Sequence, residues 1–423
     1  MLAYVPNEIT VQIFEFADFD IFNYQNLQLF FPWIYNLMSD ACYVNKKNKN
    51  GMSPLMAAIE LENQIRNNSA LLYGTRSSSK YTVCYQRLLQ IVKKIVLVSG
   101  ANLDLRGTNL QRSALFYAKN NPKITKLLVE AGADVNLRDS LGQTALMSSV
   151  LELGYLELNF YDEHIDYDDH EEEAFRLVWS IEELLKAPGI SVDVPCRDGT
   201  SVLMVAAGRM KSIPLPKTCG KICAMMEVAR MLIDYGVDVN AKDEYGNTAL
   251  MIACRRNSSN FVSVLMEKVM ESNVEVHVNE KDKFDGQTAL MKLLDTNWNE
   301  DSDNTDILKT LRMLLSFPGI DVDLQDFHGC TAISYSVKKK KFLSTEALLN
   351  HGADVNIRDF KGRSILQKCK CDDIKCMIKP FNKRKRHMCK FCGHPKKDHP
   401  RKCPRIQKTF FTSHSKERQG PRS

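Results

Sequence analysis

The chain alternates between short apolar stretches with a helical period and polar residues that recur in a fixed order. Stretches such as ITKLLVEAG, VARMLIDYG and LRMLLSFPG space their apolar residues three and four positions apart, as in a helix with one buried face. After each stretch comes a variant of Gly-Ala-Asp-Val-Asn, clearest at Gly132, Gly236 and Gly352. The pattern predicts helices that are separated by tight turns of one repeated design.

A second motif follows each turn. It reads Gly, any residue, Thr or Ser, a small or apolar residue, then Leu or Ile, and it starts at positions 51, 111, 142, 199, 246, 286, 329 and 362. The third residue is Thr or Ser in every copy, and only Gln111 replaces the Gly. Glycine suits a left-handed turn, the hydroxyl can cap the next helix by accepting a backbone N–H, and the Leu or Ile begins the buried face of that helix.

These motifs resemble the ankyrin repeat family over residues 44–370. The resemblance implies an all-α solenoid of about eight units, each a hairpin turn followed by two antiparallel helices that bury their apolar faces against neighbouring units. Successive motifs lie 60, 31, 57, 47, 40, 43 and 33 residues apart, so several units carry insertions relative to the family's period of about 33. We expect insertions at 155–173 and 208–220, between the two helices of a unit.

The insertion at 155–173 is strongly acidic. It could bind the basic C-terminal tail of the same chain or hold a cation through His164 and His170. A solvated acidic loop is the simpler expectation for so polar a segment.

The body of the chain shows no sign of catalysis. It contains no Gly-rich phosphate loop, no GxSxG motif and no HExxH motif, so a non-enzymatic function is expected. The ankyrin resemblance implies instead a concave protein-binding surface of hairpin tips and first helices. Just before the motif glycine, successive units place Tyr245, Phe284, Phe327 and Phe360. Exposed rings would anchor a protein partner, whereas packed rings would only stiffen the array.

Residues 1–43 have two interpretations. The residues that resemble the F-box pattern are Pro6, Glu8, Ile9, Ile13, Phe14 and Trp33. An F-box would make this chain the substrate receptor of a cullin-type ubiquitin ligase, although the usual Val-Cys before the Trp is absent and Phe30, Phe31 and Pro32 stand there. Alternatively, the segment caps the open end of the solenoid with apolar helices. Neither a secretory signal nor a membrane span is recognisable, so we expect an intracellular protein of the nucleus or cytoplasm.

Charge is distributed unevenly along the chain. The 57 Lys and Arg residues outnumber the 51 Asp and Glu residues by 6. Residues 377–423 hold 15 of the basic residues and only Asp398 and Glu417 among the acidic ones, which leaves an acidic body. A basic tail on an acidic body predicts a polyanionic partner, most simply a nucleic acid.

Residues 389–404 carry a metal-binding pattern. Cys389, Cys392, His399 and Cys403 follow the spacing Cys-x2-Cys-x6-His-x3-Cys, so two thiolates from one tight turn, an imidazole and a third thiolate can surround a Zn²⁺ ion. The pattern resembles the zinc knuckle, Cys-x2-Cys-x4-His-x4-Cys, with two residues more before the His and one fewer after it. His394 is an alternative ligand. A second zinc site could use Cys369, Cys371, Cys376 and His387.

The zinc-knuckle resemblance implies binding of RNA or single-stranded DNA. Phosphates could pair with Lys383, Arg384, Lys385, Arg386, Lys390, Lys396, Lys397, Arg401, Lys402 and Arg405. The ring of Phe391 could stack on a base. Two alternatives remain: the finger binds protein, or the KRKR run in the basic linker 371–388 is a nuclear import signal. We expect residues 405–423 to be a disordered basic tail.

Overall fold

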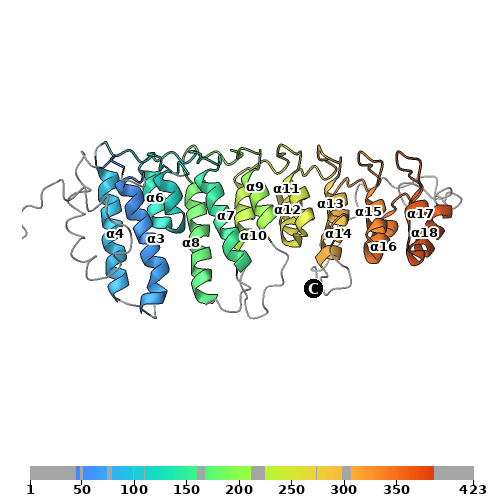
Figure 1. The fold of residues 1–423 in the computed structure, drawn as a ribbon, viewed down its shortest axis with the longest axis horizontal. Helices are drawn as coiled ribbons and strands as arrows, with labels where there is room; N and C mark the ends of the chain where they lie inside the picture. Colours follow the sequence, from blue (N-terminus) through green and yellow to red (C-terminus); the bar gives the residue numbers. More distant parts are fainter. Residues whose placement is uncertain are drawn as a thin grey trace, which may run out of the picture.

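The chain folds into a row of helix pairs in this computed structural model (Figure 1). The structure describes residues 44–47, 51–73, 79–98, 100–108, 110–159, 167–210, 224–272, 274–297 and 306–384. All regular elements in these ranges are helical, as the sequence predicts.

The first helices of the pairs are α3 (Pro54–Tyr73), α5 (Ala114–Tyr117) with the 3₁₀ turn η1 (Ala118–Asn120), α7 (Ala145–Asn159), α9 (Val202–Arg209), α11 (Ala249–Arg256), α13 (Ala289–Leu294), α15 (Ala332–Lys338) and α17 (Ile365–Lys368). The second helices are α4 (Ser79–Leu97), α6 (Pro122–Glu130), α8 (Tyr167–Leu185), α10 (Ala224–Asp234), α12 (Ser259–Ser272), α14 (Asp306–Ser316), α16 (Phe342–His351) and α18 (Asp372–Arg384). Each sequence motif therefore opens one pair.

The pairs stack in two helical layers. First helices contact the first helices of adjacent units, as α9, α11 and α13 do, and second helices contact second helices, as α10, α12 and α14 do. The turns that join one pair to the next all lie along one long edge of the row (Figure 1). This is the solenoid that the repeated motif predicts, because a unit buries its apolar side only against its neighbours.

The motif residues play the roles expected of them. The hydroxyl of Ser or Thr accepts a hydrogen bond from the backbone N–H three residues later at Ser53, Thr144, Ser201, Thr248, Thr288 and Ser364. The motif glycines have φ angles between +69° and +80°, which a side chain disfavours. Gln111 adopts the same left-handed backbone at φ +54°, so this unit keeps the turn without the glycine.

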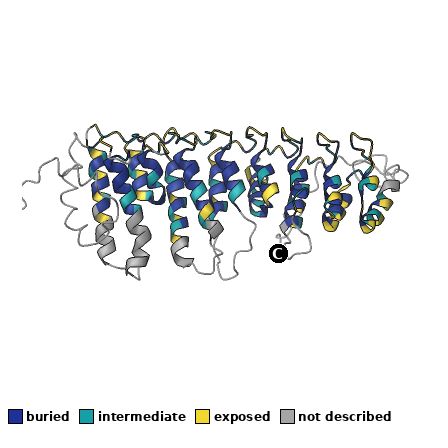
Figure 2. Cartoon of the chain, in the orientation of Figure 1, coloured by how far each residue is buried: buried dark blue, intermediate teal, exposed yellow. Residues whose placement is uncertain are grey.

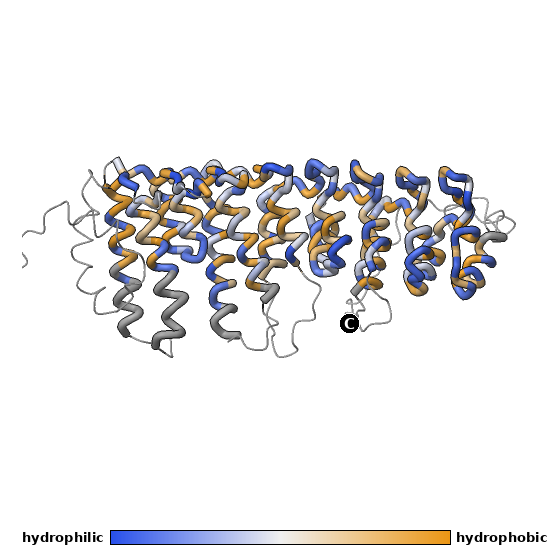
Figure 3. Tube along the Cα trace, viewed as in Figure 1, coloured by the Kyte–Doolittle hydropathy of each residue, from blue (hydrophilic) through white to orange (hydrophobic). Residues whose placement is uncertain are grey.

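The apolar residue that ends each motif starts the core. These residues are Leu55, Leu115, Leu146, Leu203, Leu250, Leu290, Ile333 and Ile365, and none is more than 3% exposed. Buried and apolar positions run without a break from pair to pair between the two helical layers (Figures 2 and 3). The core is therefore one continuous strip rather than a separate core for each unit.

Two units differ in length from the rest. Helices α3 and α4 are 20 and 19 residues long, and α7 and α8 are 15 and 19, so these pairs extend beyond their neighbours at the side opposite the turns (Figure 1). Much of the segment 155–173, expected as a loop, continues α7 to Asn159 and begins α8 at Tyr167. His164 and the core of the insertion 208–220 lie outside the described residues.

Candidate protein-interaction surface on the hairpin edge

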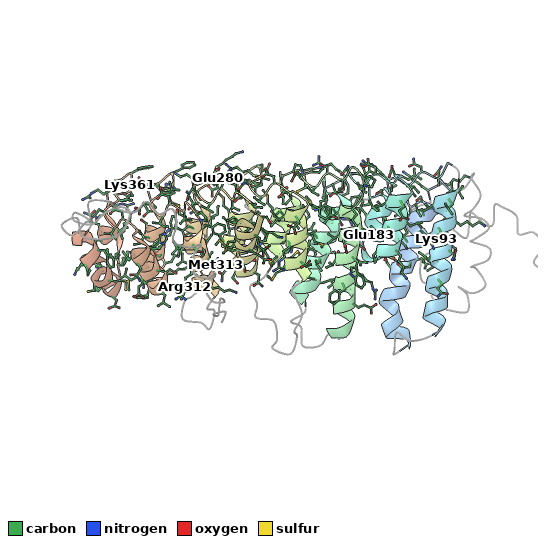
Figure 4. All side chains as sticks on the ribbon, turned by 180° about the vertical axis from the view of Figure 1, so that it is seen from behind. Lys93, Glu183, Glu280, Arg312, Met313 and Lys361 are labelled. Carbon is green, nitrogen blue, oxygen red and sulfur yellow. The ribbon has the colours of Figure 1, made fainter. Side chains whose placement is uncertain are left out.

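The turns between helix pairs form a continuous surface that we call the hairpin edge. It consists of residues 100–108, 110–113, 131–144, 186–201, 235–248, 274–288, 317–331 and 352–364. Glu280 and Lys361 project from this edge, away from the helices (Figure 4). Two sets of hydrogen bonds join neighbouring hairpins, and a third set joins hairpins to the first helices of their own units.

The first set is a ladder of Asn and Asp side chains. In each step a side-chain oxygen accepts a hydrogen bond of 2.6–2.9 Å from a backbone N–H of the next hairpin. The acceptor and donor residues are Asn45 and Asn102, Asp104 and Asp134, Asn136 and Ser191, Asp193 and Asp238, Asn240 and His277, Asn279 and Asp321, and Asp323 and Asp354. The ladder thus links every described hairpin to the next.

The asparagine side chains that accept in the ladder each make a second hydrogen bond to the next hairpin. The Nδ2 groups of Asn45, Asn136, Asn240 and Asn279 each donate to a backbone carbonyl of the next hairpin at 2.7–2.8 Å. Asn45 makes the same pair of bonds as the interior asparagines. Residues 44–47 are therefore already a hairpin of this array, placed directly after the N-terminal segment 1–43, which lies outside the described residues.

The second set joins the hairpin tips directly. The backbone N–H groups of Lys283, Phe327 and Phe360 donate to the carbonyls of Tyr245, Asp285 and His328 in the preceding hairpin, at 2.9, 2.8 and 3.3 Å. Tyr245, Phe327 and Phe360 thus take part in a hydrogen bond between neighbouring tips, and Phe284 follows a residue that does. The orientation of the tips relative to one another is fixed by backbone contacts.

The third set closes several of the turns on a buried aspartate. Asp282 accepts backbone N–H bonds within its own turn and pairs with the Lys292 ammonium on α13. Asp326 accepts the hydroxyl of Tyr335 at 2.5 Å, and Asp359 pairs with Lys368 at 2.8 Å. Hydrogen bonding from Lys368 holds the pKa of Asp359 below its usual range. These aspartates tie the hairpin edge to the first helices.

The four predicted aromatic residues lie on this edge and are exposed. Tyr245 is 50% exposed, Phe284 78%, Phe327 56% and Phe360 70%. The rings of Phe327 and Phe360 lie against the preceding hairpins, because a Cβ atom added at Gly286 would lie 2.6 Å from Cδ1 of Phe327, and one at Gly329 would lie 2.9 Å from Cδ1 of Phe360. Phe327 and Phe360 therefore rest on the preceding glycine and present the rest of the ring to solvent.

The sequence analysis did not predict two members of this row. Leu110 directly precedes Gln111 and Leu141 directly precedes Gly142, as Tyr245 precedes Gly246, and they are 38% and 49% exposed. Their place beside the motifs at 111 and 142 is the sequence signal for them, but the prediction covered aromatic residues alone. We call Leu110, Leu141, Tyr245, Phe284, Phe327 and Phe360 the apolar row.

The predicted nucleic-acid and zinc residues cannot be placed on this surface. Cys389, Cys392, His399 and Cys403 lie beyond the described residues, as do the predicted phosphate-binding residues from Lys385 onward and Phe391. The backbones of Lys383 and Arg384 form the last turn of α18.

Within the described part of the chain, no three His, Cys, Asp or Glu side chains gather to hold a metal. Cys369, Cys371 and Cys376 therefore do not form a site by themselves. Cys369 is buried, and its thiol donates to the carbonyl of Cys371 at 3.2 Å. Among the described helices, none is long and apolar enough to cross a membrane.

Comparison with known proteins agrees with this geometry. Residues 218–299 match the family described as ankyrin repeats in three copies, and residues 111–140 and 328–360 match the single ankyrin repeat. The chain carries ankyrin repeats. The fold is accordingly an all-helical ankyrin-repeat solenoid in the described residues.

The repeats have relatives with very different names. The chain is 27% identical to the mouse B-cell lymphoma 3 protein homolog over 34% of its own length and 30% of that protein, and 26% identical to the human mitochondrial disaggregase over 41% of its length and 28% of that protein. The chain thus spans about a third of these relatives, so their names are no guide to its own activity.

The crystal structure of the ankyrin repeat domain of Bcl-3 covers 78% of this chain and all of that domain, at 17% identity and a TM-score of 0.39. So distant a likeness supports no argument about function.

Proposed function

We propose that this protein is a non-enzymatic adaptor with two binding parts. The apolar row on the hairpin edge holds a protein partner. The tail holds Zn²⁺ through Cys389, Cys392, His399 and Cys403, and binds RNA or single-stranded DNA through the basic residues around them.

The observation that carries the first part is the exposure of the row on a fixed support. Large rings at the centre of an interface supply much of its binding energy. Phe327 and Phe360 lie on the glycines of preceding hairpins, so they lose little side-chain freedom when a partner binds. The tips also carry charges of both signs, including Glu244, Lys283 and Lys361, which suits a mixed polar and apolar protein surface better than a polyanion.

A pulldown from cell lysate tests this proposal. We expect the chain with Phe284→Ala and Phe327→Ala to lose a protein partner, with binding weakened by about 2 kcal/mol or more. Trp179→Ala is the matched control, because Trp179 is 54% exposed on α8 rather than on the hairpin edge. A partner that binds both variants equally would contradict the assignment of the apolar row.

Two further arms of the same experiment separate the remaining possibilities. RNase treatment should release partners that reach the tail only through RNA. Cullin and adaptor subunits in the pulldown, absent when the chain starts at Val44, would identify the alternative function of a ubiquitin-ligase substrate receptor. The adaptor proposal expects no such subunits.

A further inference from the structure

The last hairpin, 352–364, has no following hairpin among the described residues. Asn356 holds the ladder position that Asn279 and Asp323 hold in the two preceding units. Its Nδ2 donates only within its own turn, to Asp354 at 3.1 Å, and no described residue donates to its Oδ1. The ladder of side chains therefore ends with an open acceptor.

The backbone of this hairpin is open in the same way. Lys361 precedes its motif glycine as Tyr245 and His328 precede theirs, but no described N–H reaches the Lys361 carbonyl. A Cβ atom at Gly246, Gly286 or Gly329 would lie 2.5–2.8 Å from an atom of the next hairpin, whereas at Gly362 it would meet no atom of the described residues within 4 Å. The turn at Gly362 thus has the shape that receives another hairpin, and no described residue occupies that place.

The helices of the same unit end differently. Ile365, Ile374 and Ile378 are buried against the preceding unit. The exposed positions of α17, α18 and the turn between them are mainly polar and charged, among them Gln367, Lys370, Asp372, Asp373 and Lys379. A polar outer surface closes the helical layers of a solenoid. Only the hairpin layer remains open, so its occupant needs to be an extended segment and not a further helix pair.

We propose that residues 385–393 of this chain bind along the open edge as a ninth hairpin, with Gly393 in the place that Gly362 holds in the eighth. The backbone N–H of Lys385 would donate to Oδ1 of Asn356, and that of Phe391 to the carbonyl of Lys361. The path of the chain supports this. Every second helix leads back toward the hairpin edge (Figure 1), so α18 runs toward the edge that is open.

The proposed alignment of residues 385–393 with the hairpin 352–364 follows from the spacing of glycine and phenylalanine residues. Gly393 follows Gly362 by 31 residues, the same step that separates the motifs at 111 and 142. Phe391 stands two residues before Gly393, as Phe360 stands two before Gly362, and would extend the apolar row by one ring. Lys385 directly follows α18, whereas Asp354 comes three residues after the end of α16, a difference that unwinding of the last residues of a helix can absorb.

Charges also match in this register. Lys385 would lie beside Asp354, and Cys389 and Cys392 beside Arg358 and Lys361, each offset by 31 residues. A Zn²⁺ ion with three thiolates and a neutral imidazole has a net charge of about −1, which two exposed cations would stabilise. This charge argument rests on the proposed zinc site, whereas the argument from the ladder does not.

Hydrogen–deuterium exchange on the full chain tests the proposal. In the wild-type chain we expect residues 385–393 to exchange about tenfold or more slowly than an unprotected segment, and Asn356→Ala to return them to nearly the unprotected rate. Asn356→Asp should keep the protection, because Asp104, Asp193 and Asp323 serve the same ladder. Lys370→Ala, on the opposite side of the same unit, is the control that should change nothing.

Three outcomes would overturn the proposal. They are unprotected exchange in the wild-type chain, protection that survives Asn356→Ala and so depends on zinc alone, and protection that appears only in a dimer, which would make a second copy the occupant. Zinc content is measured on the same samples. Protection that depends on Asn356 in a chain without zinc would remove the zinc site and leave the ninth hairpin standing.

Discussion

At the scale of single residues, the turn of each motif depends on a left-handed backbone position at the first motif residue. Seven motifs fill it with glycine, and Gln111 fills the eighth at φ +54°. The glycine serves a second purpose in the later units, because Gly286 and Gly329 leave the space that the rings of Phe327 and Phe360 occupy. One residue type thus satisfies both the turn geometry and the packing of the next unit.

We expect Gln111→Gly to raise the free energy of unfolding by up to about 1 kcal/mol, because it removes the strain of a side chain in the left-handed region. Gly142→Ala is the opposite change and should destabilise the chain, since its Cβ would lie 2.9 Å from the backbone nitrogen of Arg197. Urea denaturation measures both. A loss of stability in Gln111→Gly would mean that the glutamine side chain contributes more than its backbone costs.

The aromatic tips should differ from one another in their effect on stability. Phe284 is 78% exposed, so Phe284→Ala should change the free energy of unfolding by less than about 0.5 kcal/mol. Phe327 covers Gly286, and Phe327→Ala should cost about 1 kcal/mol for the buried part of its ring. Thermal unfolding of the two variants decides this. Equal large losses would make the row structural rather than a binding surface.

At the scale of elements, the sequence predicted what the motif itself encodes. Ser201 and Thr248 cap their helices and Leu203 and Leu250 begin the core, as expected. The ladder between hairpins was not predicted, because its donors are backbone N–H groups and residues as different as Ser191 and His277 supply them.

Helix lengths could not be predicted where the inserted sequence lacks an apolar period. The segment 155–173 is acidic, so no apolar period in it marks where α7 ends or where α8 begins. The candidate site could also be predicted only in part. The rings of Tyr245 and Phe360 could be found from their place in the motif, but their exposure depends on how much of each ring the preceding turn covers.

The contribution of the hairpin aspartates to the free energy of unfolding should depend on pH. Burial of Asp282 opposes its ionisation, but the Lys292 ammonium and the backbone N–H groups of Asp285 and Gln287 outweigh it and lower the pKa of Asp282. A lowered pKa contributes stability above the ordinary carboxyl value of about 3.9 and loses it as the pH falls further. Asp282→Asn should therefore destabilise the chain at pH 7.

The test is the difference in unfolding free energy between wild type and Asp282→Asn as a function of pH. It should shrink as the pH falls below about 4, because the wild-type carboxylate then becomes neutral as well. The exposed Asp373 makes no ion pair with a described residue, so Asp373→Asn should leave the pH profile unchanged. A difference that stays constant down to pH 2.5 would assign the effect to hydrogen bonding alone.

At the scale of the whole molecule, a long hairpin edge and a short basic tail are joined through α18. The repeats offer protein contacts along their length, whereas the tail concentrates 15 Lys and Arg residues within 377–423. An adaptor of this design would hold a protein on the array and a polyanion at its C-terminal end. Replacing the proposed metal ligands of the tail would separate the two proposed roles.

We expect the full chain to bind one zinc ion and to lose it in Cys389→Ser and in Cys403→Ser, but not in Cys376→Ser, whose exposed thiol lies on α18 and outside the motif 389–403 in sequence. Zinc uptake should fall steeply in acid, because protons compete for the thiolates and the imidazole.

With zinc, the chain should bind single-stranded RNA with an affinity that drops strongly as salt rises, and Phe391→Ala should cost about 1–3 kcal/mol if a base stacks on that ring. Equal RNA binding with and without zinc would show that the metal does not shape the nucleic-acid site and would leave charge alone to explain the affinity.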